Sequence, residues 1–382
     1  MNLGIFVPNV GNFGAKGYYN SQEVGLAKEL ARKCDNVIIF KLVIGKNKIC
    51  EEIIKANCKI IYIPAKKIGI NGLIKNFDFI RNYKLNKLVC FSDTQIIVKS
   101  LYEYCNNNNI MFIPYIGVIE SNSSNKLVRK VMNLIVKRNI NIYKRCNFVM
   151  AKTPHIYKKL KRLGLKNIKI SPVGLDFELL NNNYTDTDVS KAKLQFGFNS
   201  TDKIILFIGR LEKQKNPILA VDILKEVLTY DKNYHMIIIG KGNLKEELIK
   251  KINDENLKDN IKYIEKISNN EIWKYYSISE CFINLNMEEI FGMAILESMF
   301  YNCPVIAVSA PGPNYIIKDK ETGILINKLD INNFAFNIVN SKQILDKIRM
   351  NSKLYIKENF SWIKCSNNIL NGGSNGKEKY FS

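Results

Sequence analysis

Two cations stand close together in one short segment, where they could bind phosphate. Arg210 and Lys215 lie in the segment GRLEKQKNP, directly after the apolar run Ile204–Ile208 and before a helix-like segment. Arginine presents a planar fork of donors that matches phosphate oxygens, lysine adds a point charge, and Gly209 lets the backbone approach a ligand closely. The pattern predicts a diphosphate site; a surface loop that merely happens to be basic is the alternative.

Two carboxylates form the second candidate. Glu289 and Glu297 are separated by seven residues in the segment EIFGMAILE. Carboxylates accept hydrogen bonds from hydroxyls, so each could hold one end of a nucleotide sugar. A helix that begins at Phe291 would leave the following amides unpaired at its positive end, where they could hold an anion. These are the amides of Gly292, Met293 and Ala294. In the alternative interpretation, Glu289 is only a helix-cap acid and Glu297 only an exposed helix residue.

Two glycine-containing loops complete the candidates. The segment Gly14–Gly17 follows the apolar run Leu3–Pro8, but it lacks the G-x-G-x-x-G spacing of dinucleotide-binding loops. The segment Ala310–Asn314 also follows an apolar run, and a simple turn explains it nearly as well. Ligands of doubly wound sheets bind at the carboxyl ends of the strands, which is where all these loops are expected.

The elements that position these loops alternate between short β-branched runs and helical patterns. In the first half the predicted strands are Leu3–Pro8, Val37–Phe40, Lys59–Ile63, Lys87–Phe91, Met111–Tyr115, Phe148–Ala151 and Ile168–Pro172. In the second half they are Ile204–Ile208, Met236–Ile239, Lys262–Ile264, Cys281–Asn284 and Val305–Val308, with helices near Pro217–Thr229, Leu244–Ile252, Asn270–Ser279 and Phe291–Phe300. Such alternation predicts an α/β fold with parallel sheets covered on both faces.

The chain of 382 residues is too long for one ordinary core. A polar, non-periodic segment at 181–189 separates the two series of elements. We therefore predict two doubly wound, Rossmann-like domains at 1–180 and 190–350, facing each other across a cleft. The chain after Asp330 is predicted to be helical to about Leu370.

The formal net charge of +22 predicts an anionic partner, and much of the excess is local. No acidic residue occurs from Ser121 to Leu175. At 100° per residue, one face of a helix in this region is basic, whereas Leu127, Val131 and Leu134 fall on the other. The basic side chains proposed as a membrane face are Lys126, Arg129, Lys130, Lys137 and Lys144. Alternatively, these cations form an ordinary solvated outer face of a helix whose apolar face packs on the core. Nucleic acid is not expected as a partner, because no nucleic-acid-binding signature accompanies the charge.

Metal and membrane-spanning signals are missing from the sequence. The nine cysteines are spread widely without a C-x-x-C pair, and His155 and His235 are the two histidines. Neither a disulfide framework, a zinc site nor a His-rich metal site is therefore expected. Because the sequence has no long apolar run and no secretion signal at the start, we expect a cytoplasmic protein. The basic helix adds the expectation that the protein attaches peripherally to the inner face of the cytoplasmic membrane.

Taken together, these motifs resemble family 4 of the retaining glycosyltransferases, which have the GT-B fold. The resemblance covers most of the chain and rests on GRLEKQKNP, the E-x7-E pair with FG between its members, CPVIAVSAPGP, and SPVGLD at Ser171–Asp176. It implies that domain 1–180 binds the acceptor and domain 190–350 the nucleotide sugar. It also implies that the C-terminal helix at 351–372, which contains Ser361-Trp362, crosses back to the first domain.

The resemblance assigns roles residue by residue. Arg210 and Lys215 would bind the donor diphosphate and act in catalysis with Glu289, which would touch the transferred sugar; Glu297 would bind the ribose. The remaining donor-binding residues would be Gly17, Gly209, Phe291, Gly292, Met293 and Ala294.

Three positions depart from the family pattern. Tyr18 replaces the second glycine of the N-terminal loop, and Ile290 replaces the glycine after the first glutamate. The acceptor-side histidine of many relatives is missing, and the sequence leaves open whether Tyr115, Glu120 or any other residue replaces it. His155 starts a helix one strand later, where a structural or capping role is expected rather than a catalytic one.

The expected activity is transfer of a hexose or N-acetylhexosamine from a nucleotide-diphosphate sugar to a saccharide acceptor, with retention of configuration. The acceptor is expected to be lipid-linked, in the synthesis of a cell-surface polysaccharide such as a capsule or lipopolysaccharide. No metal or other cofactor is expected. A GT-B nucleotide-sugar epimerase, or a catalytically degenerate basic protein that binds membranes or nucleic acid, remains as an alternative. Donor, acceptor, linkage and oligomeric state do not follow from the sequence.

Overall fold

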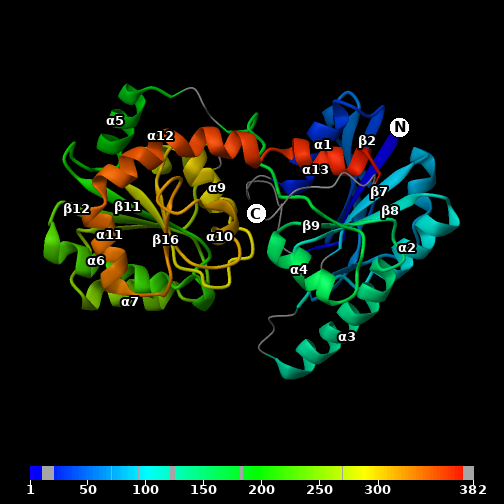
Figure 1. Cartoon of the computed structure of the whole chain (residues 1–382), viewed down its shortest axis with the longest axis horizontal. Helices are drawn as coiled ribbons and strands as arrows, with labels where there is room; N and C mark the ends of the chain where they lie inside the picture. The colour runs from blue at the N-terminus through cyan, green and yellow to red at the C-terminus, as the bar shows by residue number, and fades with distance from the viewer. Residues whose placement is uncertain are drawn as a thin grey trace. The chain divides into compact units, whose positions relative to one another are not determined.

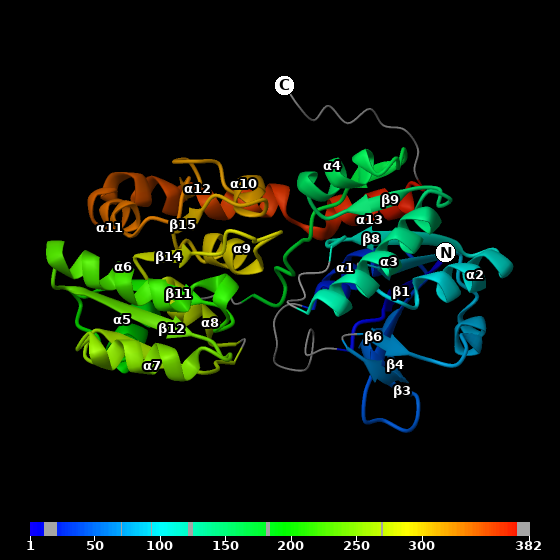
Figure 2. The same cartoon turned by 90° about the horizontal axis from the view of Figure 1, so that it is seen from below.

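The computed structural model divides the chain into two units, each built around one sheet (Figures 1 and 2). The first unit comprises Met1–Asp176 and Trp362–Ser382, and the second comprises Phe177–Ser361. The structure describes residues 1–10, 21–69, 71–92, 94–120, 125–180, 184–268 and 270–372. The Gly14–Gly17 loop, including Gly17, lies outside the described residues.

The first unit holds an eight-stranded sheet. Its order is β10 (Ile168–Ile170), β9 (Val149–Ala151), β8 (Met111–Ile116), β7 (Lys87–Phe91), β1 (Asn2–Val7), β2 (Asn36–Val43), β4 (Cys58–Pro64) and β3 (Cys50–Lys55). The strands pair in parallel, except that β3 runs antiparallel to β4 at the edge. β1 and β2 are buried along nearly their whole length, because both faces of a parallel sheet are covered.

The other elements of the first unit connect and cover this sheet. They are α1 (Gln22–Ala31), the hairpin β5 (Lys66–Ile68) and β6 (Asn71–Leu73), the 3-10 helix η1 (Asp78–Tyr83), α2 (Val98–Asn107), α3 (Lys126–Tyr143), α4 (Pro154–Arg162) and α13 (Trp362–Leu370). A Cβ atom at Gly25 of α1 would lie 2.3 Å from Nε1 of Trp362. α1 and α13 therefore pack this closely because position 25 carries no side chain.

The second unit holds a six-stranded parallel sheet. Its order is β13 (Ile261–Ile264), β12 (Tyr234–Ile239), β11 (Lys203–Ile208), β14 (Cys281–Asn284), β15 (Val305–Val308) and β16 (Ile324–Ile326). The other elements are α5 (Asp186–Gln195), η2 (Lys213–Lys215), α6 (Pro217–Tyr230), α7 (Lys245–Asp254), α8 (Ile272–Ser277), α9 (Met293–Phe300), α10 (Pro313–Ile316), α11 (Ile331–Asn340) and α12 (Lys342–Asn359).

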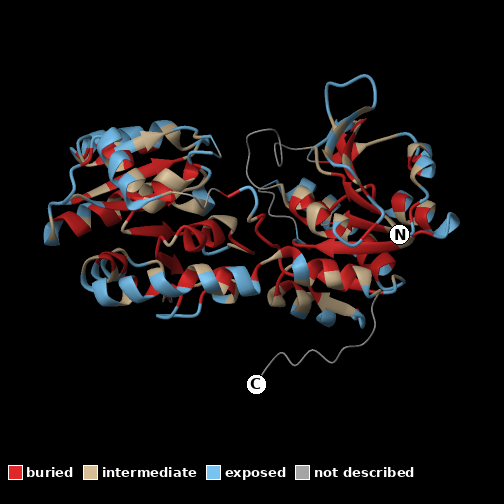
Figure 3. Ribbon diagram, turned by 90° about the horizontal axis from the view of Figure 1, so that it is seen from above, coloured by how far each residue is buried: buried red, intermediate tan, exposed pale blue. Residues whose placement is uncertain are grey.

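Helices cover both faces of this second sheet. Alternate residues of a strand point to opposite faces, and Ile205 and Phe207 of β11 join the core that contains residues of α6, α7 and α11. On the other face, the ring of Phe282 lies edge-on to that of Tyr276 of α8, with centroids 6.1 Å apart. The strands are accordingly buried in Figure 3. The predicted α/β class and parallel sheets are confirmed.

The structure differs from the sequence prediction at the boundaries between the units. The segment at 181–189 overlaps α5, whose first turn is closed by a capping box between Thr185 and Asp188. The chain instead passes from the first unit to the second between Asp176 and Phe177. The segment at 351–372 contains parts of two helices, because α12 ends at Asn359 in the second unit and α13 begins at Trp362 in the first.

The first turns of α3 also differ from the prediction. Leu127, Val131 and Leu134 were expected on a core face, yet they are 71%, 49% and 63% exposed. Burial begins only at Asn139, where the helix reaches the body of the unit. Within the described chain, every helix falls short of the length or apolar content that crossing a lipid bilayer requires.

Candidate active site

The loop after β11 carries the two predicted phosphate-binding cations. Its backbone turns through η2 and then through Asn216, whose φ of 52° and ψ of 48° place it in the left-handed region just before Pro217 starts α6. The Asn216 side-chain amide donates to the Leu285 carbonyl at 2.8 Å. This bond ties the loop that carries Lys215 to the chain leaving β14, the strand next to β11.

Two glycines after β12 allow this loop to lie where it does. A Cβ atom at Gly240 would lie 1.8 Å from the Gly209 carbonyl oxygen, and one at Gly242 would lie 2.3 Å from the Leu211 carbonyl oxygen. The Leu211 N–H in turn donates to the carbonyl of Lys241 at 3.0 Å. This G-K-G segment was not among the sequence candidates, although its position directly after an apolar run was a usable signal.

Lys215 and Glu289 form an ion pair. The Lys215 ammonium lies 2.5 Å from Oε2 of Glu289, and the two side chains are 23% and 15% exposed. The buried Asn286 amide donates to the same oxygen at 3.2 Å. The other carboxylate oxygen, Oε1, has no partner among the residues that the structure describes. One oxygen of Glu289 is therefore fixed and the other can accept a hydrogen bond from a ligand.

Asn286 is held in turn by the tight turn that presents Glu289. Its side-chain oxygen accepts from the Glu288 N–H at 3.0 Å, and its backbone carbonyl accepts from the Glu289 N–H at 3.2 Å. With the oxygen so engaged, the amide NH₂ faces Glu289. Sequence reasoning missed Asn286, because only the turn geometry reveals that it contacts the acid three residues later.

The Ala310–Asn314 loop packs against the same turn. The Gly312 N–H donates to the Glu289 carbonyl at 2.6 Å, and a Cβ atom at Gly312 would lie 2.2 Å from the Phe291 carbonyl oxygen. The loop therefore supports the backbone on both sides of Ile290.

The helix predicted to begin at Phe291 begins two residues later. α9 starts at Met293, and Gly292 occupies the N-cap with a φ of 104° that favours glycine. Within the described structure, the amides of Met293 and Ala294 find no backbone acceptor, as expected for the first residues of a helix. These two amides form the positive end of the helix.

Glu297 is buried on α9, which excludes its interpretation as an exposed helix residue. It is 2% exposed, and the Tyr276 hydroxyl lies 3.4 Å from its Oε2. The same hydroxyl lies 3.3 Å from the Ala294 carbonyl. Tyr276, which sequence reasoning did not single out, therefore connects Glu297 to the first turn of the helix.

Arg210 is not part of the Lys215–Glu289 pair. Its side chain is 57% exposed, and its guanidinium donates to Oε1 of Glu212 at 2.7 Å. The structure thus joins Lys215 directly to Glu289, and it leaves Arg210 on the surface of the same loop.

The residues considered as substitutes for the acceptor-side histidine lie in the first unit. Tyr115 is fully buried on β8, with the Lys152 ammonium 5.0 Å from its ring centroid. Glu120 is exposed and pairs with Lys159 at 2.9 Å. His155 lies in the first turn of α4, where burial and then the charge of Lys159 lower its pKa.

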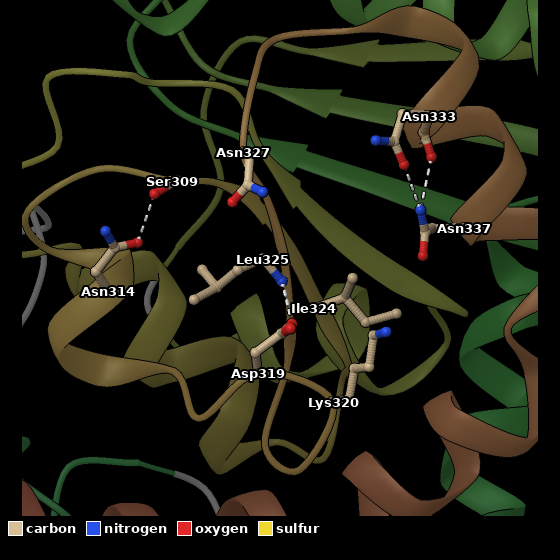
Figure 4. Close-up of a pocket in the computed structure, with 9 residues that line it drawn as sticks. All are labelled: Ser309, Asn314, Asp319, Lys320, Ile324, Leu325, Asn327, Asn333 and Asn337. Atoms are coloured by element: carbon tan, nitrogen blue, oxygen red, sulfur yellow. Dashed lines mark hydrogen bonds between the residues drawn. The ribbon is translucent and has the colours of Figure 1, made fainter.

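A separate polar cavity of about 490 Å³ lies in the second unit beside the edge strand β16 (Figure 4). Asn314, Asn327 and Asn333 contribute amides to its wall, and Leu325 lies between them. Lys215, Glu289 and Glu297 are not among its lining residues. Across the described ranges, three or more His, Cys, Asp or Glu side chains nowhere gather in a way that could hold a metal ion.

The chain is similar to known proteins over part or most of its length. Residues 188–341 match the family Glycosyl transferases group 1. The alpha-monoglucosyldiacylglycerol synthase of Acholeplasma laidlawii is 25% identical over 239 residues, which are 62% of this chain and 58% of that protein. The N-acetylgalactosamine-N,N'-diacetylbacillosaminyl-diphospho-undecaprenol 4-alpha-N-acetylgalactosaminyltransferase of Campylobacter jejuni is 25% identical over 365 residues, 91% of each chain.

Solved structures share the fold over nearly the whole chain. Sucrose-phosphate synthase from Thermosynechococcus elongatus aligns with a TM-score of 0.76 and 16% identity, covering 97% of both chains. HepE from Anabaena, in complex with UDP and glucose, aligns with a TM-score of 0.73 and 14% identity, covering 97% of this chain and 98% of that one. The chain therefore has the GT-B fold, and its residues 188–341 match the group 1 glycosyltransferases.

Proposed function

We propose that this protein is a retaining glycosyltransferase that moves a hexose or N-acetylhexosamine from a nucleotide-diphosphate sugar to a saccharide acceptor. The Lys215–Glu289 pair carries the proposal. It places a cation suited to phosphate beside an acid suited to sugar hydroxyls, at the carboxyl ends of the neighbouring strands β11 and β14.

The donor would be bound by groups with separate tasks. An ammonium has three donors, so Lys215 keeps donors for the diphosphate while it holds Glu289. The Met293 and Ala294 amides would bind a phosphate oxygen at the positive end of α9. Arg210 would join them by exchanging its exposed bond to Glu212 for the phosphate. Glu289 would accept a sugar hydroxyl through Oε1, and Glu297 a ribose hydroxyl.

In the proposed reaction, the bond between the sugar's anomeric carbon and the diphosphate oxygen breaks, and a bond to the acceptor oxygen forms on the same face. The acceptor's proton passes to the departing phosphate oxygen, so the scheme needs no acceptor-side histidine. Negative charge grows on the leaving diphosphate, and fixed donors aimed at such charge typically contribute about 10²-fold or more in rate. The proposal assigns this stabilisation to Lys215, Arg210 and the α9 amides, without a metal ion or other cofactor.

The acceptor would be lipid-linked, as in the synthesis of a cell-surface polysaccharide such as a capsule or lipopolysaccharide. Two relatives named above support this choice, since their names give a diacylglycerol product and a diphospho-undecaprenol acceptor. The protein would then work on the inner face of the cytoplasmic membrane, attached through the basic side chains of α3 and of Lys144 at its C-cap.

The first test is binding and transfer with the full chain. A panel of nucleotide sugars should contain one that raises the melting temperature, because a ligand that binds only the native state stabilises it. Transfer from that donor should give a product with the donor's anomeric configuration, measured by NMR coupling constants. Lys215→Met and Glu289→Gln should lose transfer, whereas Lys203→Met should keep it because that lysine pairs with Asp231 at the opposite end of β11. Inverted products would refute retention.

The epimerase alternative is separated by incubating the protein with a labelled nucleotide sugar and no acceptor. Formation of an isomerised donor would favour the epimerase and contradict the proposal. Salt-sensitive nucleic-acid binding without any binding of nucleotide sugars would instead favour a degenerate basic protein.

A further inference from the structure

The first turns of α3 extend away from the sheet of the first unit (Figure 1), and they carry an apolar stripe that the described fold leaves uncovered. Leu127, Val131 and Leu134 follow the i, i+4, i+7 spacing that places side chains on one face of a helix. Their exposures are 71%, 49% and 63%. Scattered apolar side chains are ordinary on a protein surface, but a stripe on one helix marks a contact surface.

This stripe is distinct from the face by which α3 joins its own unit. Met132, Ile135 and Val136 are partly covered, and Ile140 and Tyr143 are buried farther along the helix. Leu127, Val131 and Leu134 point away from that direction by the helical periodicity. Packing within the first unit therefore does not account for the stripe.

Cations border the stripe. Lys126, Lys130 and Lys137 lie along one side of it, and all three are exposed. None of them has an acidic partner within the described ranges, and the sequence from Ser121 to Leu175 contains no acid. A surface that is apolar in the middle and cationic at its border matches the interface of an anionic lipid bilayer. A second copy of the same helix would instead bring like charges together.

We propose that α3 lies in the interface of an anionic membrane, with Leu127, Val131 and Leu134 inserted among the acyl chains and the neighbouring cations at the level of the lipid phosphates. This deepens the proposed function, whose lipid-linked acceptor would be met there, by adding insertion of apolar side chains to charge attraction. Binding by attraction alone would vanish at high salt, whereas insertion leaves a salt-resistant part.

The test is flotation of the full chain with vesicles of phosphatidylcholine alone or mixed with phosphatidylglycerol. Binding should require the anionic lipid at low salt, and part of it should survive molar salt. The variant Leu127→Ser/Val131→Ser/Leu134→Ser should lower the partition coefficient about 1,000-fold or more, since transfer of each aliphatic side chain out of water is worth at least about a factor of ten. Lys126→Gln/Lys130→Gln/Lys137→Gln should remove mainly the salt-sensitive part.

A matched control and a direct probe keep the proposal refutable. Met350 and Leu354 are 83% and 63% exposed one turn apart on α12, so Met350→Ser/Leu354→Ser removes comparable apolar surface and should leave vesicle binding unchanged. A tryptophan introduced by Leu134→Trp should shift its emission to the blue with anionic vesicles. Equal loss in both serine variants, or no shift at position 134, would overturn the proposal.

Further outcomes separate this proposal from its rivals. The α3 serine variant should keep the native circular dichroism spectrum and the thermal shift with nucleotide sugar. If the membrane proposal failed, the proposed transferase activity would therefore still stand. Sedimentation that shows a dimer abolished by the serine substitutions would assign the stripe to a second copy and overturn the membrane assignment. If the α3 substitutions removed nucleic-acid binding and left vesicle binding unchanged, the membrane assignment would be overturned as well.

Discussion

Replacing Asn286 by alanine should weaken catalysis by loosening Glu289 rather than by unfolding the protein. The Asn286 amide donates to Oε2 of Glu289 at 3.2 Å, on the oxygen that Lys215 also holds. A hydrogen bond to a charged group is worth about 1.5 to 3 kcal/mol, and the length of this one points to the lower end. Since about 1.4 kcal/mol equals a factor of ten, kcat/KM for the donor should fall about tenfold.

The assay separates positioning from folding through two further variants. Asn286→Asp keeps the volume and the oxygen that accepts from Glu288, but it sets a second negative charge beside Glu289, so its loss should exceed that of Asn286→Ala. Asn337→Ala removes a partly exposed amide that donates to Asn333 on α11, and it should leave kcat and KM unchanged. Full kcat/KM in Asn286→Ala, or a loss that merely follows a lower melting temperature, would refute a positioning role for Asn286.

Two further predictions concern stability. Gly240→Ala would place a Cβ atom 1.8 Å from the Gly209 carbonyl oxygen. Thermal denaturation should therefore show a loss of about 1 to 3 kcal/mol in the free energy of unfolding, and nucleotide-sugar binding should weaken as the loop shifts. An unchanged melting temperature would contradict the packing argument. Hydrogen bonds from Lys225 and then Lys251 lower the pKa of Glu255 from 4.5 to about 2. The stabilisation from this carboxylate is present above the unfolded pKa and is lost as pH falls through the folded pKa. Glu255→Gln should therefore lower the melting temperature at neutral pH and match wild type near pH 2. A difference in melting temperature that does not change with pH would exclude the Glu255 carboxylate as its origin.

Local patterns were enough to predict the sheets. The run Ile204–Ile208 lies inside β11, and the loops after β11 and β14 carry the predicted residues Lys215 and Glu289 where a doubly wound sheet binds ligands. Strand type and loop position depend on neighbours in the chain, so they can be read from the sequence.

Contacts between separate segments could not be predicted in the same way. The approach of Gly240 to Gly209 depends on how two loops pack, and helical periodicity could not reveal that Leu127 is exposed. The start of α9 was misplaced because the left-handed backbone at Gly292 delays the helix. A periodic pattern shows which side chains share a face, but not what covers that face.

The assignment of α13 to the first unit has a consequence for synthesis. The first sheet leaves the ribosome early, yet Trp362, which packs against Gly25, emerges only after the whole second unit. Because translation runs from the N-terminus and domains tend to fold as they emerge, the unit begun first is completed last. A chain that ended before position 362 would therefore contain all of the second unit and a first unit that still lacks its closing helix.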